Sequence, residues 1–196
     1  PEFGMENRKL RRKYHVADEY DYRENSIYKT YLACDAVSDE ILLRNHYRCN
    51  KKIIDFNNKK YYNSKLQVQS DSRERQPLVY VNVDGGPGDM KNTSPAEVEE
   101  IMRYAGENPD KSIAVITPFV NKRILIERGI KENGFEHVVC GTVHAFQGDE
   151  KDVVLFSTAL SDRTGKGTYD WLKNNKELIN VATSRAKDKL ILLADG

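Results

Sequence analysis

Residues 140–158 read CGTVHAFQGDEKDVVLFST, a polar segment between two apolar runs. An apolar run that includes Val138, Val139 and Val143 leads into a polar segment, and a second apolar run, Val153 to Phe156, follows it. Short runs rich in β-branched residues are typical of strands covered on both faces, as in a parallel sheet. Ligands of open α/β sheets bind where loops leave the carboxyl ends of the strands, so the polar segment is a candidate site. An ordinary solvated connection is the alternative interpretation.

The alternation of strands and helices continues on both sides of this stretch. Ser94-Pro95-Ala96-Glu97 has the pattern of a capping box with proline at the first helical position, and Asn133-Gly134 is a typical helix end. Strands that alternate with helices predict an α/β domain, a mostly parallel sheet flanked by helices. Further strands are predicted at Leu78–Val83, Ile113–Ile116 and Lys189–Ala194, helices from Asn50, from Ser94, from Phe119 and over Glu177–Lys187, and a polar loop at 161–168.

The composition is that of an ordinary globular protein. Of the 196 residues, 31% are charged and 39% are hydrophobic, and the formal net charge of +1 means that any nucleic-acid binding would use a local surface. No apolar run approaches the ~20 residues of a membrane-spanning helix, so no membrane partner is expected. The three cysteines show no paired spacing, which predicts neither a disulfide framework nor a zinc site. A reducing intracellular, cytoplasmic location is expected.

Three segments resemble motifs of one enzyme family. TVHAFQGDEKDVV, at Thr142 to Val154, is similar to motif V of superfamily 1 helicases, in the branch that includes the nonsense-mediated decay helicase. LLRNHYRCNKKIIDF, at Leu42 to Phe56, resembles motif IV, and LINVATSRAKDKLILL, at Leu178 to Leu193, resembles motif VI. VITPF, at Val115 to Phe119, also fits this family. Within motif VI, residues 183–185 are Thr-Ser-Arg where the family commonly has Leu-Thr-Arg.

The resemblance implies a three-layer RecA-like domain, a P-loop NTPase-like fold without its own P-loop. The sequence contains no GxxxxGK[ST] motif, since Gly165-Lys166 is followed by Gly167 and lacks the upstream glycine. Residues 40–196 then correspond to the second RecA-like domain of a two-domain motor. Residues 5–39 would form the lead-in from a first motor domain, with 18–28 irregular, and residues 1–4 look like a remnant of cloning.

Two arginines are the first candidates for catalysis. Arg185 follows the apolar helical positions Leu178, Val181 and Ala182, and an arginine is costly to bury there without an anion. Its planar guanidinium suits phosphate oxygens. The resemblance implies that Arg185 of motif VI and Arg48 of motif IV both contact the γ-phosphate of ATP. The alternative for each arginine is a structural ion pair with a carboxylate.

The polar residues of motif V divide into two groups by resemblance. One group would bind the nucleic-acid backbone, and the other would lie near the nucleotide, with a coupling residue between them. His144 could instead be a hydrogen-bonded loop histidine, and Thr117 could simply cap the helix that follows it. The expected nucleic-acid contacts are Thr142, His144 and Thr117, the coupling residue is Gln147, and the nucleotide contacts are Gly148 and Glu150 together with Arg48 and Arg185.

The function implied by this resemblance is that of the C-terminal motor domain of an ATP-dependent helicase or translocase. It would move 5′ to 3′ on single-stranded DNA or RNA, with ATP and Mg²⁺ bound mainly by the N-terminal RecA-like domain. Without a phosphate-binding loop and magnesium ligands, this chain alone is expected not to hydrolyse ATP. The alternative is a non-catalytic RecA-like module for nucleic-acid binding or docking. A nuclease finds no support, because no carboxylate cluster with metal-ligand spacing occurs.

Overall fold

The computed structural model describes residues 2–21, 23–34, 41–86, 88–146, 150–161 and 164–195. The chain divides into two compact units, an N-terminal unit (Pro1–Leu42) and a sheet unit (Leu43–Gly196). The N-terminal unit contains helix α1 (Glu2–Lys13), a 3-10 helix (Asp18–Tyr20) and helix α2 (Ile27–Cys34). Arg11 forms ion pairs with both Asp18 and Asp21 in this unit. Residues 18–28, expected to be irregular, contain the 3-10 helix and the first two residues of α2.

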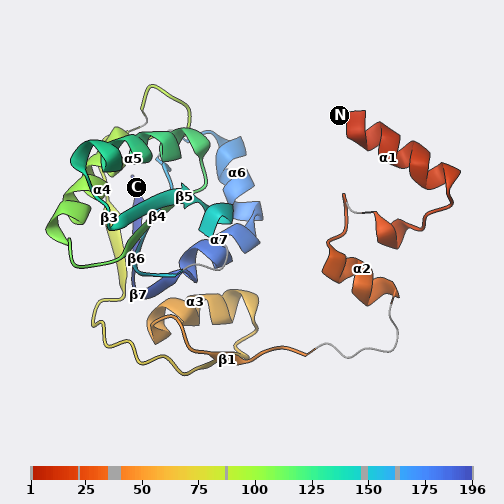
Figure 1. Cartoon of the computed structure of the whole chain (residues 1–196), viewed down its shortest axis with the longest axis horizontal. Helices are drawn as coiled ribbons and strands as arrows, with labels where there is room; N and C mark the ends of the chain where they lie inside the picture. Colours follow the sequence, from red (N-terminus) through yellow and green to blue (C-terminus); the bar gives the residue numbers. More distant parts are fainter. Residues whose placement is uncertain are drawn as a thin grey trace. The chain divides into compact units, whose positions relative to one another are not determined.

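The sheet unit is built on five parallel strands (Figure 1). Their order across the sheet is β3, β7, β6, β4 and β5, and each neighbouring pair is parallel. A separate parallel pair is formed by two-residue strands, β1 (Asn45–His46) and β2 (Gln67–Val68). The predicted α/β fold with a mostly parallel sheet is thus confirmed. The bounds are β3 (Leu78–Asn82), β4 (Ile113–Thr117), β5 (Val138–Thr142), β6 (Lys151–Ser157) and β7 (Ala186–Ala194).

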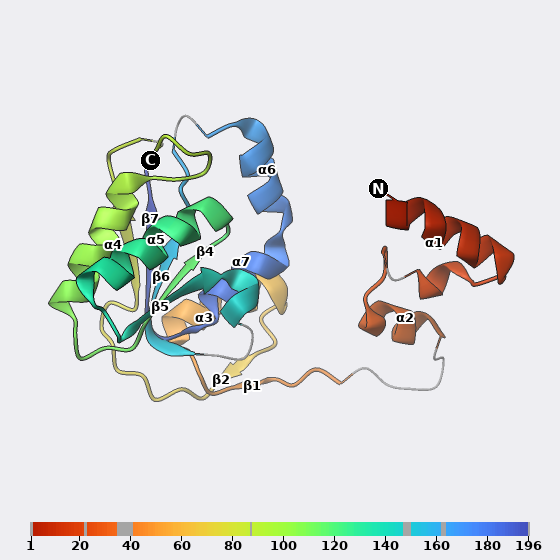
Figure 2. The same ribbon diagram turned by 45° about the horizontal axis from the view of Figure 1, so that its top comes forward.

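Helices cover both faces of the sheet and complete three layers (Figures 1 and 2). Helices α4 (Pro95–Glu107) and α5 (Val120–Asn133) pack on one face through buried residues such as Ile101 and Ile126. The opposite face is covered by α3 (Lys51–Tyr61), α6 (Lys166–Asn174) and α7 (Lys176–Thr183). Each face has its own apolar cluster, so the β-branched runs are covered on both sides, as expected for central parallel strands.

The helix ends follow local chemistry. Ser94 Oγ accepts a hydrogen bond from the Glu97 amide at the start of α4, and Gly134 ends α5 in the left-handed region with φ 68°. Two predictions were wrong. The helix predicted over Glu177–Lys187 ends at Thr183, because Ala186 already pairs with Lys151 in the sheet. The predicted loop at 161–168 overlaps the first turn of α6, because Gly165 and Gly167 are residues typical of loops.

The connection from β5 to β6 is unusually short for a parallel crossover. It consists of a 3-10 helix (Val143–Phe146) and a few further residues, and both Val143 and Phe146 are buried against the apolar cluster under α7. A side chain at Gly141 would lie 2.9 Å from the ring of Phe146, so a glycine is needed where the chain folds back. The crossover leaves the carboxyl end of β5 and reaches the amino end of β6.

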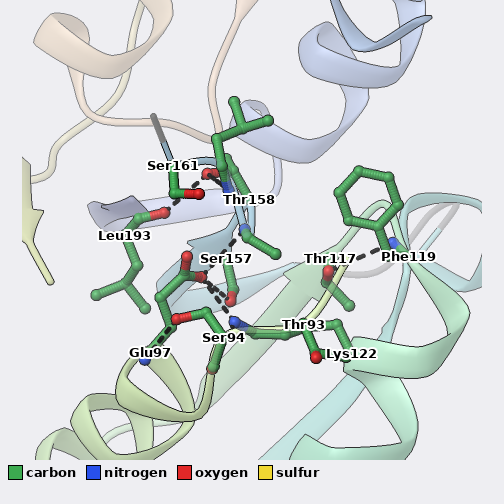
Figure 3. A network of polar contacts seen from close by, with 12 residues as sticks. Thr93, Ser94, Glu97, Thr117, Phe119, Lys122, Ser157, Thr158, Ser161 and Leu193 are labelled. Atoms are coloured by element: carbon green, nitrogen blue, oxygen red, sulfur yellow. Dashed lines mark hydrogen bonds and ion pairs between the residues drawn. The ribbon is translucent and has the colours of Figure 1, made fainter. Parts of the chain in front are cut away.

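A buried ion pair joins the two helices of one face to the sheet (Figure 3). Lys122 Nζ of α5 lies 3.0 Å from Glu97 Oε2 of α4, and both side chains are fully buried. Lys122 also donates to the Ser94 carbonyl at 3.0 Å, and Ser157 Oγ at the end of β6 donates to Glu97 Oε2 at 2.5 Å. The pair therefore fixes the carboxyl edge of the sheet relative to α4 and α5.

Replacing Lys122 by alanine should lower the free energy of unfolding by about 3–5 kcal/mol, because Glu97 would remain buried without its cation. Urea denaturation followed by circular dichroism measures the change. The double variant Glu97→Leu/Lys122→Met should recover most of the loss, because apolar residues of similar size need no partner.

Arg103→Ala is the matched control for this experiment. Arg103 also lies on α4 and pairs with Glu100 and Glu107, but its side chain is exposed. Its removal should leave the denaturation midpoint nearly unchanged. A Lys122→Ala variant as stable as Arg103→Ala would show that the buried pair does not fix this edge.

Candidate nucleotide and nucleic-acid sites

Arg48 and Arg185 lie on two segments that the structure ties together. Arg48 precedes α3, and Arg185 lies in the turn between α7 and β7. The amide of Asn50 donates to the carbonyl of Lys187 at 2.7 Å, and the thiol of Cys49 donates to the carbonyl of Ser184 at 3.3 Å. These bonds hold the two arginine-bearing segments side by side at the amino edge of the sheet.

Glu150 joins the two arginines to form what we call the arginine cluster: Arg48, Glu150 and Arg185. Arg48 Nε donates to Glu150 Oε2 at 2.5 Å, and Arg185 Nε donates to the carbonyl of Val181 at 3.2 Å. The side chains of Arg48 and Glu150 are 31% and 49% exposed, so their ion pair is open to solvent and can exchange partners. The ion pair considered for Arg48 from the sequence is thus present, but its partner is not an interior acid.

The electrostatics of the arginine cluster favour an anion. Burial, and next the positive charge of Arg48, lower the pKa of Arg185, while Cys49 and Glu150 act in the opposite direction. The guanidinium nevertheless stays charged at neutral pH, as arginines do in proteins. Two cations and one carboxylate leave the cluster with a positive charge that suits phosphate oxygens.

The side chains of His46 and Cys49, next to the arginine cluster, are both uncharged. The amide of Cys49 donates to His46 Nε2 at 3.0 Å, which requires an unprotonated nitrogen there. Burial, followed by the nearby charge of Arg48, lowers the pKa of His46, so the ring remains a neutral acceptor. Burial raises the pKa of Cys49 to about 12, so its thiol also carries no charge. Neither group offsets the positive charge of the two arginines.

The predicted nucleic-acid residues begin at the opposite, carboxyl edge of the sheet. Thr117 and Thr142 are register partners at the ends of β4 and β5. Thr117 is fully buried, and its hydroxyl accepts a hydrogen bond from the amide of Phe119 at 3.4 Å. This bond satisfies a backbone amide just before α5, the capping role considered for Thr117. Thr142 is half-buried. The geometry favours Thr142 over Thr117 as a group that can reach a ligand.

Parts of motif V lie outside the described residues. Gln147 and Gly148 are not described, and His144 is described only by its backbone in the 3-10 helix. Glu150 lies one residue before β6, in the arginine cluster. The segment from Thr142 to Glu150 therefore begins at the carboxyl edge of the sheet and ends at the amino edge.

A large open cleft at the carboxyl edge contains residues that the sequence analysis did not single out. Its volume is about 990 Å³, and it lies between the start of α5, the loop before α4 and the start of α6. Phe119 and Trp171 face each other there, with ring centroids 6.0 Å apart. The signal in the sequence is weak: Trp171 is the one tryptophan of the chain, and it lies on α6, which the sequence analysis does not predict.

Neither a metal-binding cluster nor a membrane-spanning helix occurs in the described ranges. No group of three or more histidine, cysteine, aspartate or glutamate side chains is placed to bind a metal ion there. No described helix combines the length and the apolar character needed to cross a membrane.

The chain is similar to one protein family and to several helicases. The family described as "AAA domain" matches residues 23–196, well over half of the chain. An "uncharacterized ATP-dependent helicase" of Methanocaldococcus jannaschii is 29% identical over 182 residues, which are 79% of this chain and 26% of that protein. The regulator of nonsense transcripts 1 homolog of Drosophila melanogaster is 26% identical over 178 residues, 76% of this chain and 15% of that protein.

A solved structure shares the fold. It is the C-terminal domain of a possible DNA helicase from Lactobacillus plantarum WCFS1, with a TM-score of 0.51 and 19% identity over 76% of this chain and 88% of that one. The chain spans between 7% and 26% of the length of the first curated relatives that it matches. The chain therefore belongs to the AAA domain family, and it is similar to superfamily 1 helicases, with its sheet unit as a RecA-like fold.

Proposed function

We propose that this chain is one half of an ATP-driven motor that moves along single-stranded DNA or RNA. The arginine cluster would reach the γ-phosphate of an ATP molecule bound by an N-terminal RecA-like domain of the same protein. That domain would also supply the phosphate-binding loop and the Mg²⁺ ligands. Movement in the 5′-to-3′ direction is part of the proposal, by likeness to the decay-helicase branch.

The single observation that carries this proposal is the pairing of Arg48 and Arg185 at one edge of the sheet. Side chains from motifs IV and VI, far apart in the sequence, meet there with Glu150 of motif V. Two fixed cations can stabilise the charge that develops on a transferring phosphoryl group, the role of an arginine finger. Because the chain lacks a GxxxxGK[ST] motif, we propose that it does not hydrolyse ATP by itself.

The path of motif V supports a physical link between the nucleotide site and the nucleic-acid site. Thr142 lies at the carboxyl edge, where we propose contact with the nucleic-acid backbone, and Glu150 lies in the arginine cluster at the amino edge. The crossover between them is short and is anchored by buried Phe146. When Arg48 exchanges Glu150 for phosphate, Glu150 loses its ion-pair partner, and a shift at this end of the crossover is passed to Thr142. Gln147, on this segment, is proposed as the coupling residue.

A non-catalytic docking module is the second candidate function. The observation in its favour is the Arg48–Glu150 ion pair, which needs no nucleotide. The two candidates differ in one respect: the motor needs Arg185 for turnover, whereas the module has no turnover to lose.

In the two-domain protein that we propose, Arg185→Ala should lower the ATP turnover number by about 10³-fold or more, because the transition-state charge loses one guanidinium. Arg185→Lys should restore little, because an ammonium group cannot form a bidentate contact. Steady-state ATP hydrolysis in the presence of a saturating single strand measures the effect.

Arg128→Ala is the control for this prediction, because Arg128 is an exposed arginine of α5 outside the arginine cluster. It should leave turnover unchanged. Binding of a labelled oligonucleotide should stay within twofold for both variants. Turnover of Arg185→Ala within a few-fold of the parent would contradict the arginine-finger assignment.

Thr142→Val should weaken single-strand binding about tenfold for all base sequences alike, because it removes a hydroxyl donor to a charged phosphate and keeps the side-chain shape. Thr142→Ser keeps the hydroxyl and should bind normally. Fluorescence anisotropy with labelled oligothymidylate and oligouridylate measures both affinities. Equal affinities of the valine and serine variants would argue against a backbone contact by Thr142.

A further inference from the structure

We infer that Trp171 stacks on an unpaired base of single-stranded nucleic acid in the carboxyl-edge cleft. The inference rests on the proposed function, because it names a second contact with the same strand. It adds a residue that lies outside the helicase motifs quoted above, on α6 between motifs V and VI.

The first observation is the exposure and setting of the indole. Trp171 is 42% exposed and lines the open cleft, while Phe119 across from it is buried. Their rings are tilted by 39° with centroids 6.0 Å apart, so Phe119 supports the indole without covering it. A half-exposed tryptophan supported by another aromatic ring offers a stacking surface, and every base has a face that can stack on it.

The second observation is that the loop before α4, which forms one wall of the cleft, is preformed. The amide of Gly88 donates to the carbonyl of Thr93 at 2.8 Å, and Thr93 Oγ1 donates to the carbonyl of Met90 at 2.6 Å, so this loop is closed on itself. Asn121 of α5 donates to the carbonyl of Lys91 at 3.2 Å and attaches the loop to the helix. Lys122 of the buried pair donates to the carbonyl of Ser94, which directly follows this loop, and the cleft therefore needs little rearrangement to accept a ligand.

The third observation is the charge of the cleft. Among the described residues that line it, Asp89 is the one carboxylate and Lys91 the one cation, and the other polar groups are uncharged. A nearly neutral, partly aromatic cleft suits an uncharged base better than a phosphate. Hydroxyl groups of Thr164 and Thr168, and the backbone at Gly165, can bond to base edges or to the sugar.

The cleft also continues from the proposed backbone contact. Pro118 and Phe119 line it and directly follow Thr117, the register partner of Thr142. A single strand of nucleic acid whose backbone contacts Thr142 would therefore lie next to the cleft, along the same edge of the sheet. Proteins that bind single-stranded nucleic acid commonly contact the phosphates with one set of residues and stack bases on neighbouring aromatic residues.

The test uses the full 196-residue chain and the fluorescence of Trp171, the one tryptophan in the sequence. Anisotropy of labelled oligothymidylate and oligouridylate reports binding, and tryptophan emission in the same titrations reports stacking. We expect binding to quench the emission strongly, since a stacked base contacts the indole. An abasic strand of the same length, which has phosphates but no bases, should bind without this quenching.

Variants separate stacking from structural support. Trp171→Ala should weaken binding by about tenfold, the loss of one base stack, and Trp171→Phe should restore most of the affinity. The matched control is Tyr169→Ala. Tyr169 is an exposed aromatic residue of the same helix that lines a different cavity, between α3, α6 and α7, and its removal should leave affinity within twofold.

The outcomes distinguish this inference from the proposed function. Binding without quenching, or equal quenching by the abasic strand, overturns the stacking role and leaves the proposed strand contact at Thr142 intact. Normal affinity of Trp171→Ala overturns it as well. If anisotropy shows no binding of either strand to the chain, both the stacking role and the proposed contact with the strand are overturned.

Discussion

The position of β6 between β4 and β7 is the constraint on which the rest of the structure depends. Lys151 at the start of β6 pairs with Ala186, and the amide of Lys151 donates to the carbonyl of Arg185 at 3.2 Å. This pairing places Glu150 and Arg185 at one edge of the sheet. Because the strands are parallel, Thr142 at the end of β5 must lie at the opposite edge, and the chain has to cross the sheet between them. One register therefore sets both proposed sites and the segment that joins them.

The crossover from β5 to β6 is short, and its first residues are part of the core. In the described part of the crossover, a single 3-10 turn (Val143–Phe146) follows β5, with Val143 and Phe146 in the core. Close-packed interiors deform little, so the buried Val143 and Phe146 fix the carboxyl-edge end of the crossover that we propose as the coupling segment. The buried Glu97–Lys122 pair acts at that edge as a fixed point, because it joins α4 and α5 to the end of β6 through Ser157.

Much of the fold could be predicted from the sequence because its signals are local. The apolar runs of the central strands and the cap at Ser94 require only neighbouring residues, and both appear as expected. Helix α6 was missed because Gly165 and Gly167 resemble a loop, although its apolar residue Leu172 is buried by tertiary packing. The end of α7 was placed too late because pairing of Ala186 in the sheet, a long-range constraint, stops the helix.

The candidate sites divide in the same way. Arg48 and Arg185 could be chosen from motifs, but their meeting with Glu150, 102 residues from Arg48, depends on the tertiary fold. Trp171 lies on α6 and Phe119 precedes α5, so no spacing in the sequence indicates their contact.

The central claim is that Arg48 and Arg185 act on ATP bound elsewhere. Its most direct test is a crystal structure of the two-domain protein with a transition-state analogue of phosphoryl transfer. The account predicts both guanidinium groups within hydrogen-bond distance of the analogue's equatorial oxygens, with Arg48 released from Glu150. A closed complex in which Arg48 remains paired with Glu150 and neither arginine reaches the analogue would contradict it.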